Sequence, residues 1–436
     1  MRTRVLGLSF GLALSWLIVC AGIAGAVEPS TEQRLLQLSE QTNRELTANI
    51  LPFWLKYAPD ESTGGFQGQV DNRLRADPSV PRGALLTSRI LWTFSAAYSR
   101  VQGERPEYLA MAKRAAADLL NRFWDQQHGG FFWTVDVQGK PENTTKQIYG
   151  QAFGVFALSE YYRVTHDEAA LKRAQELYRL LETHAKDAKH GGYFEIFARD
   201  WTAERQSKSF VSPKAAKSQN THLHIMEAYT SLARVWPDAE LKSSLRAIVE
   251  LMLTKIYDPR TKHLQLFLTD DWKPLSETYS YGHDIEAAWL LNEADGVLGE
   301  AELSKRVRET ALNLAEETLA SGIDRDGGVF NEGNRRGPTL RTKDWWPQAE
   351  AVVGFLDAYG LSRDSRFLNA AEKTWSFIQA KFADHAGGEW FQSLDDRGAV
   401  VTHPKISLWK CPYHNGRACL EATERAARLL RPRAAN

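Results

Sequence analysis

Apolar residues recur at helical spacing through most of this chain. They fall at i, i+3, i+4 and i+7, the pattern of a helix that buries one face. Six windows of this kind predict one set of helices, at 89–101, 151–164, 222–236, 284–298, 348–361 and 416–430. Further windows, such as 107–124 and 171–185, predict a second helix between successive members of the first set.

Short turn-and-strand segments separate these helix pairs. Gly-Gly pairs followed by aromatic or β-branched residues begin at Gly64, Gly129, Gly191, Gly327 and Gly387. The spacing is roughly 64 residues, with one interval of about two periods. The segment "HLQLFLT", which starts at His263, lies within that long interval and lacks the glycines. The chain therefore contains six turn units.

Six turn units with two helices each predict an all-α fold, an (α/α)6 barrel of about twelve helices with short β-turn or hairpin elements at the repeat loops. An open solenoid is the alternative, but six units of this length suit closure into a ring. No Pro/Ser-rich linker divides the chain, so we expect a single catalytic domain at 27–436. The pocket of such a barrel lies at one end, where loops and inner-helix heads converge.

The N-terminus has a different character. "MRTR" carries two positive charges, an apolar stretch follows to about residue 25, and "AGA" ends at Ala26. This pattern predicts a secretory signal peptide at 1–26, cleavage after Ala26 and a periplasmic or secreted protein. The apolar run is also long enough for an uncleaved anchor. A lipoprotein at Cys20 fits less well, because the preceding Val19 is bulky.

Composition narrows the function classes. Lys plus Arg and Asp plus Glu are both 54, which gives no support for nucleic acid or an acidic membrane as the main partner. After signal cleavage we expect no stable membrane association and a monomer or weak homo-oligomer. Cys411 and Cys419 could pair, but two cysteines make no disulfide scaffold. The 14 Trp, 14 Tyr and 19 Phe fill a core or stack on sugars.

Four of the eleven histidines have unusual neighbours: His222, His224, His283 and His414. Each lies at the head of a predicted inner helix, and in a closed barrel those heads point to the same end. A buried, hydrogen-bonded structural imidazole is the alternative for any one of them. Other polar and aromatic residues near the helix heads suit a polyhydroxylated substrate; they are Arg89, Tyr149, Asn220, Glu286, Trp346, Glu350 and Trp409. Simple packing is the alternative for the tryptophans.

Longer motifs carry a resemblance. "KQIYGQAFGVFALSEYYR", "NTHLHIMEAY", "YGHDIEAAWLL", "WWPQAEAVVGF" and "WKCPYHNGR" resemble the N-acylglucosamine 2-epimerase superfamily, and within it the cellobiose 2-epimerases, from about residue 31 to 430. The resemblance implies reversible epimerisation at C2 of the reducing-end glucose of a β-1,4-linked disaccharide such as cellobiose. Lactose and mannobiose are further possible substrates. Relatives are usually cytoplasmic, and the predicted export signal is a departure from that pattern.

The resemblance also implies residue roles. His283 and His414 match the acid/base pair at C2, and His224 matches a histidine of ring opening or substrate holding. Arg89, Tyr149, Asn220, Glu286, Trp346 and Trp409 match substrate contacts. Imidazole suits proton transfer at C2 because its unperturbed pKa, about 6.5, lies near working pH. We therefore expect no cofactor and no metal. Arg89 could stabilise the enediolate, and Glu286 could hold the His283 imidazole.

Several alternatives stay open. The protein could belong to the N-acylglucosamine 2-epimerase or mannose isomerase branch. A glycoside hydrolase could use carboxylates such as Asp284, Glu286 and Glu350, but this leaves the histidines unexplained. A metal isomerase could use His224, His283 and His414 with a glutamate, although no metal-ligand spacing continues beyond the pair 222 and 224. A non-catalytic carbohydrate-binding protein would not need the histidines.

Overall fold

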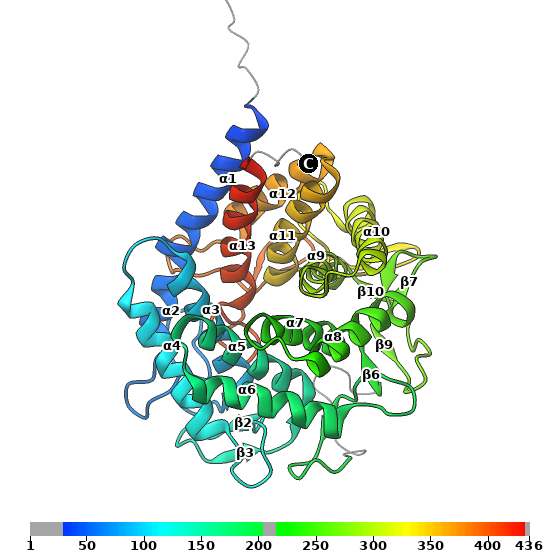
Figure 1. Ribbon diagram of the computed structural model, residues 1–436. Helices are drawn as coiled ribbons and strands as arrows, with labels where there is room; N and C mark the ends of the chain where they lie inside the picture. Colours follow the sequence, from blue (N-terminus) through cyan, green and yellow to red (C-terminus); the bar gives the residue numbers. More distant parts are fainter. Residues whose placement is uncertain (1–28, 204–214, 432–436) are drawn as a thin grey trace, which may run out of the picture.

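Six inner helices form a closed ring in the computed structural model, which describes residues 29–203 and 215–431. The inner helices are α3 (Ala84–Arg100), α5 (Ile148–Thr165), α7 (Gln219–Val235), α9 (Tyr281–Leu298), α11 (Trp345–Ser362) and α13 (Tyr413–Leu430). Neighbours pack together in this order, and α13 packs against α3, which closes the ring (Figure 1). The inner helices are buried on most sides; in α5, for example, every residue from Ile148 to Tyr161 is buried.

Six outer helices surround this ring: α1 (Thr31–Glu45), α4 (Pro106–Asp118), α6 (Glu168–Leu180), α8 (Ala239–Leu251), α10 (Ala301–Glu317) and α12 (Ser365–Phe377). Each ends in a π-helical turn: η1 (Leu46–Ile50), η2 (Leu119–Phe123), η3 (Leu181–Ala185), η4 (Met252–Ile256), η5 (Thr318–Gly322) and η6 (Ile378–Phe382). Helix α1 continues through η1 into α2 (Leu51–Tyr57). The predicted all-α (α/α)6 barrel is confirmed.

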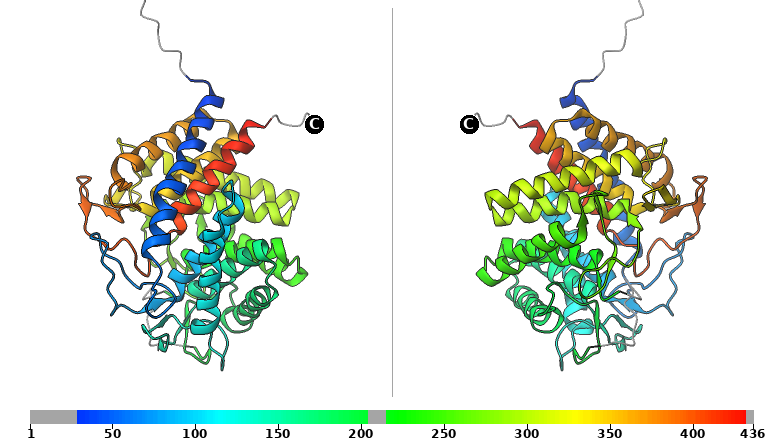
Figure 2. Two further views of the ribbon diagram at one scale, coloured as in Figure 1. Left: turned by 90° about the vertical axis from the view of Figure 1, so that its left-hand side faces the viewer. Right: turned by 90° about the vertical axis from the view of Figure 1, so that its right-hand side faces the viewer.

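Fifteen short strands are described, and they gather at the end of the barrel where the inner helices begin (Figure 2). They are β1 (Arg82–Gly83), β2 (Thr134–Val135), β3 (Pro141–Asn143), β4 (Lys146–Gln147), β5 (Ile196–Phe197), β6 (Lys217–Ser218), β7 (Tyr257–Asp258), β8 (His263–Leu264), β9 (Phe267–Leu268), β10 (Tyr279–Ser280), β11 (Glu332–Asn334), β12 (Gly337–Leu340), β13 (Lys343–Asp344), β14 (Ser393–Leu394) and β15 (Val400–Val401).

These strands pair antiparallel in small sheets ordered β1-β2-β3, β10-β11-β12, β13-β14-β15, β4-β5, β6-β9 and β7-β8. We call this end of the barrel the loop end and the opposite end the far end.

Side chains at the fourth position of an inner helix fasten its head to the preceding turn. In α5, Gln151 Oε1 accepts the Phe131 N–H at 2.7 Å and Nε2 donates to the Phe131 carbonyl at 2.8 Å. In α11, Gln348 bonds the Val329 N–H and carbonyl at 2.7 and 2.9 Å. We call such a side chain a clasp residue. Each clasp satisfies buried backbone groups of a turn and fixes the helix head against it.

His222 and Asp284 are the clasp residues of α7 and α9. His222 Nε2 accepts the Tyr193 N–H at 2.9 Å, and Nδ1 lies 2.7 Å from the Ser218 carbonyl. Asp284 Oδ1 accepts the Leu264 N–H at 2.8 Å. Of the four histidines singled out in the sequence, His222 is therefore the structural one.

Ion pairs with a buried cation lie beneath five of the six turns. The pairs are Arg82–Asp60, Lys146–Asp125, Lys217–Asp187, Lys343–Asp324 and Lys405–Asp384. The fourth turn, which lacks the Gly-Gly pair, differs: Tyr279 takes the place of the cation and stacks on His263 with ring centroids 3.4 Å apart. The one irregular repeat in the sequence is thus also the irregular turn in the structure.

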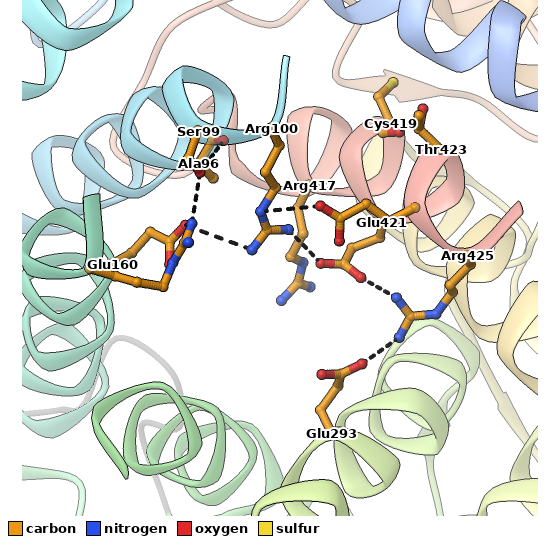
Figure 3. Close-up of polar contacts among 12 residues, drawn as sticks. Ala96, Ser99, Arg100, Glu160, Glu293, Arg417, Cys419, Glu421, Thr423 and Arg425 are labelled. Carbon is orange, nitrogen blue, oxygen red and sulfur yellow. Dashed lines mark hydrogen bonds and ion pairs between the residues drawn. The ribbon is translucent and has the colours of Figure 1, made fainter. Parts of the chain in front are cut away.

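A network of ion pairs joins the inner helices near the far end (Figure 3). We call it the far-end belt; its residues are Arg100, Glu160, Arg234, Glu293, Asp357, Glu421 and Arg425. Arg100 on α3 reaches Glu421 on α13 at 2.9 Å, and Arg425 on α13 reaches Glu293 on α9 at 2.9 Å. Because its residues come from all six inner helices, the belt ties the ring together.

Three further sequence predictions concern the two cysteines, membrane association and the N-terminal segment. Cys411 and Cys419 are both buried and both free, so they do not pair. Within 29–203 and 215–431, no helix has the length and apolarity needed to cross a bilayer. The predicted signal peptide and its cleavage site lie outside the described residues, and so does the start of the predicted domain at residue 27.

Candidate active site

The inner-helix heads bring the predicted histidines together at the loop end. His283 is the third residue of α9, His414 the second of α13, and His224 the sixth of α7. Trp346, at the head of α11, faces two of them: its ring centroid lies 4.6 Å from that of His283 and 5.6 Å from that of His414. Two imidazoles from different helices therefore border one aromatic surface.

His414 is held by a carboxylate. Its Nδ1 lies 2.7 Å from Glu350 Oε1, which also accepts from Arg417 Nη2 at 2.7 Å. Glu350 Oε2 accepts from Trp289 Nε1 at 3.1 Å. Because Glu350 accepts from every partner, the network assigns the proton to Nδ1 and leaves Nε2 as a base. Burial, with the charges of Arg89 and Arg417, lowers the pKa of His414 well below its usual value.

His224 is held in the same manner. Its Nδ1 lies 2.9 Å from Glu227 Oε2, and the Glu227 oxygens also accept the Tyr413 hydroxyl at 2.6 and 2.7 Å. Burial lowers the pKa of His224, and Glu227 offsets part of that shift. The ring stands edge-on to Tyr149, with centroids 5.1 Å apart. Two of the three predicted catalytic histidines thus have a fixed orientation.

His283 has no such partner. Its backbone N–H reaches Ser280 Oγ at 3.4 Å, but its ring Nδ1 is buried and has no hydrogen-bond partner among the described residues. Burial, and then the nearby His224, lowers the pKa of His283 to about 3. His283 is therefore a neutral imidazole near neutral pH.

The expectation that Glu286 holds His283 is wrong. Glu286 Oε1 instead accepts from Arg417 Nη2 at 2.6 Å. Its other oxygen is buried and has no hydrogen-bond partner in the part of the chain that the structure describes. Burial and the neighbouring Glu350 raise the pKa of Glu286 well above its ordinary value. Glu286 lies three residues after His283 on the same helix, but its carboxylate pairs with the buried Arg417 guanidinium on another helix.

Arg417 is the centre of the site floor, and sequence reasoning gave it no role. Its guanidinium bonds Glu227, Glu286 and Glu350, which come from α7, α9 and α11. It lies between the rings of Tyr413 and Trp289, at 4.2 and 4.6 Å. The available signal was its position one turn after His414 on the same helix face. Its partners become evident only when the ring closes.

Arg89 is a buried cation of another kind. Its Nη2 donates to the Tyr149 hydroxyl at 2.6 Å, and its guanidinium lies 4.3 Å from the centre of the Phe153 ring. Its Nη1 lies 3.5 Å from the Trp409 carbonyl. Its positive charge therefore has no carboxylate counter-ion in the described chain.

A cavity of about 180 Å³ lies beside His283. Asn220, His283 and Trp346 line it, together with Asn331, Glu332 and Asp344. Asn220 Oδ1, like His283 Nδ1, is buried without a protein partner among the described residues. Polar side chains beside an aromatic ring match the alternating apolar faces and hydroxyls of a sugar.

The ten predicted site residues all lie at the loop end, but they divide by surroundings. Arg89, Tyr149 and Trp409 form one group, with the Tyr149 and Trp409 rings 6.1 Å apart. Glu286 and Glu350 belong to the floor around Arg417.

Glu286, Glu350 and His414 offer ligand atoms within 4.8 Å of one another, which is the one candidate metal cluster found in the described ranges. Arg417 Nη2 already bonds both of these carboxylates, at 2.6 and 2.7 Å. The cluster therefore already has a cation, supplied by the chain.

The fold and these residues define a class: an (α/α)6 barrel with neutral histidines suited to proton transfer and, beside one of them, His283, a cavity suited to a sugar. A family model described as N-acylglucosamine 2-epimerase (GlcNAc 2-epimerase) matches residues 64–418. The chain belongs to this family.

Its relatives include cellobiose 2-epimerases. The enzyme of Bacteroides fragilis is 41% identical over 389 residues, which cover 88% of this chain and 98% of the relative. That of Dictyoglomus turgidum is 39% identical and covers 89% and 98%. The solved structure of cellobiose 2-epimerase from Bacillus thermoamylovorans B4167 superposes with a TM-score of 0.85 at 38% identity and covers 89% of this chain and 100% of its own.

Other branches are more distant. The D-mannose isomerase of Marinomonas mediterranea is 25% identical, and the N-acylglucosamine 2-epimerase of Bos taurus is 24% identical. A family 76 α-mannanase shares the fold at a TM-score of 0.62 with 10% identity. The barrel alone therefore does not distinguish an epimerase from a hydrolase.

Proposed function

We propose that this protein epimerises the reducing-end glucose of a β-1,4-linked disaccharide such as cellobiose at C2, with 4-O-β-D-glucopyranosyl-D-mannose as the product. The observation that carries the proposal is the pair His283 and His414, which come from different helices and both face Trp346. Cellobiose 2-epimerases are also far more similar to this chain than the other branches are.

The proton chemistry follows from the imidazoles. After the sugar ring opens, one histidine removes the C2 proton and leaves an enediolate. A second histidine on the opposite face of C2 delivers a proton to that carbon and gives the epimer. The network around His414 leaves Nε2 unprotonated, as a base requires. Each histidine removes the proton from one epimer only, so both are needed for net epimerisation.

Two further residues fit steps of this reaction. Arg89 brings a cation that no carboxylate of the described chain neutralises, and this charge stabilises the enediolate oxygen. His224, held by Glu227, suits proton transfer during ring opening. Trp346 and Trp409 provide aromatic faces for the sugar rings, which favours a disaccharide over a monosaccharide.

Product analysis tests this proposal directly. The protein is incubated with cellobiose, and the products are identified by NMR. We expect the mannose-ended epimer; glucose would indicate a hydrolase, and a ketose an aldose-ketose isomerase. A parallel panel with lactose, mannobiose, mannose and N-acetylglucosamine measures kcat/KM for each. Equal or better turnover of N-acetylglucosamine would move the protein to the sister branch.

Metal independence is a separate expectation. Since imidazoles carry the protons and Arg417 serves the cluster of Glu286, Glu350 and His414, activity should survive exhaustive treatment with EDTA. A loss of activity that added divalent metal restores would contradict the cofactor-free mechanism.

We also propose that the protein is exported. The charged start, the apolar run and "AGA" support cleavage after Ala26. Mass spectrometry of the protein from its native host should find Val27 at the mature N-terminus, whereas a full-length cytosolic chain would refute export.

A further inference from the structure

The three site histidines are not held alike. His414 and His224 each bond a carboxylate through Nδ1, at 2.7 and 2.9 Å. His283 Nδ1 has no hydrogen-bond partner in the described chain, and the ring contacts Trp346. The position of the His283 imidazole therefore depends on the backbone of the first turn of α9 more than on side-chain bonds.

The residue that fixes this turn is Asp284, directly after His283. Its Oδ1 accepts the Leu264 N–H at 2.8 Å, and its Oδ2 lies 2.7 Å from His263 Nδ1. Asp284 and His263 are 1% and 3% exposed, so water competes little for these bonds. His263 stacks on Tyr279, whose hydroxyl donates to the Asn334 carbonyl. The head of α9 is thus fastened through one carboxylate to β8, β10 and β11.

No other clasp in the described chain has this arrangement. Gln151 and Gln348 are neutral amides that bond the backbone of their turns and stop there. Of these clasp residues, Asp284 alone also bonds a second side chain, that of His263. It is also the one that directly follows a residue with a proposed role in proton transfer. The clasp with an added side-chain bond thus stands next to the histidine whose ring Nδ1 has no hydrogen-bond partner in the described chain.

We infer that Asp284, supported by His263, is a positioning residue for His283 and sets the placement of that imidazole on one face of C2. This inference rests on the proposed function. A defect in the placement of His283 should slow proton removal from one epimer only. A general loss of fold or of substrate binding would slow removal from both.

Exchange of the C2 hydrogen in D₂O separates these cases. NMR follows deuterium incorporation into cellobiose and, separately, into its mannose-ended epimer. The variant His283→Ala first identifies the epimer from which His283 removes the proton. Asp284→Ala should then slow exchange of that same epimer about 100-fold, the cost of a misplacement of about 1 Å, and change the other only a few-fold.

Two further variants guard against a failure to fold. Asp284→Asn keeps an oxygen for the Leu264 N–H and should restore part of the rate. His263→Gln leaves Asp284 in place and should slow the same epimer to a smaller extent. Gln151→Ala is the matched control, since it removes a clasp from the head of α5; it should change both exchange rates in equal proportion.

The outcomes separate the inference from the proposed function. If the wild type exchanges both epimers but the Asp284 and His263 variants slow both equally, or neither, the positioning role is refuted and the function stands. A wild type that exchanges neither epimer refutes the function. The crystal structure of Asp284→Ala then decides the inference without activity: we expect a displaced His283 ring, and an unmoved ring overturns the role.

Discussion

The two ends of the barrel are built from the same six helices and both contain buried ion pairs, but only the loop end adds neutral imidazoles to them. At the far end, the belt of arginines and carboxylates joins the inner helices through charge (Figure 3). At the loop end, His283 and His414 are imidazoles whose pKa burial lowers. The far end uses fixed charge where no proton needs to move. The loop end keeps uncharged bases where a C–H bond must break.

This difference separates stability from activity. Buried charge pairs stabilise a fold only as complete sets, because a lost partner leaves an uncompensated charge. A buried neutral histidine can be removed at smaller cost to folding. Substitutions at the two ends should therefore have opposite consequences.

The largest expected effect is on catalysis at the loop end. His283→Ala and His414→Ala should each lower the rate of epimerisation about 10⁴-fold, the upper range for a positioned acid or base. The free energy of unfolding should fall by only about 1 kcal/mol. Steady-state kinetics with cellobiose and urea denaturation measure both quantities. Near wild-type turnover in either variant would contradict the two-histidine mechanism.

The next largest expected effect is on stability, at the far end, where turnover should stay unchanged. Arg425→Met should lower the free energy of unfolding by about 3–5 kcal/mol, because Glu421, Glu293 and Asp357 lose their common partner. The folded fraction should retain wild-type turnover. Arg246→Met is the matched control: this exposed residue pairs with Glu300 at the surface, and its loss should cost less than about 1 kcal/mol. Equal losses in both variants would show that the belt carries no special stability.

A smaller effect concerns acid. Burial lowers the pKa of His222 to about 4, below the unfolded value of about 6.5. As the pH falls, the His222 imidazole is protonated in the unfolded chain before it is protonated in the folded one. The free energy of unfolding therefore decreases as the pH falls from 6.5 to 4. The loss reaches about 3 kcal/mol at the lower limit. The Glu421 carboxylate has a pKa of about 2 in the folded protein, so the far-end belt adds its own loss only as the pH falls below the ordinary glutamate pKa of about 4.5, near the lower limit of this range.

His222→Gln should remove that loss. Gln348 forms the equivalent bonds at the head of α11 without a titrating group. Urea denaturation at pH 7 and pH 5 compares the two proteins, with the exposed His385→Gln as control. An unchanged acid sensitivity in His222→Gln would mean that other groups cause it.

Much of the fold could be predicted from the sequence, and the error in it is systematic. Five of the six predicted inner helices began at residues 151, 222, 284, 348 and 416, and each begins three residues earlier; the sixth, predicted from residue 89, begins five residues earlier at Ala84. The missing first turns carry Tyr149, Asn220, His283, Trp346 and His414. These residues were selected for the pocket and not for an apolar face, so the helical period is weakest where the site is.

The site was predictable residue by residue but not as a network. The spacing of the motifs placed the histidines at the helix heads. The bonds of Arg417 join α13 to α7, α9 and α11, and no local pattern encodes which distant carboxylate it takes. Glu286 shows the same limit, because its neighbour in sequence is His283 but its partner is Arg417. The role of His222 was available from the repeat, since Gln151 and Gln348 occupy the same helical position.

The two ends of the described chain leave the barrel on the side away from the pocket. Helix α1 begins beside α12, where Arg34 bonds Glu372 at 2.9 Å, and it runs antiparallel to α13, which finishes at Leu430. A linker joined to the described chain at either of these points would therefore leave from the far end of the barrel. An enzyme immobilised on a support through such a linker would have its loop end, which carries the candidate site, facing the sugar solution.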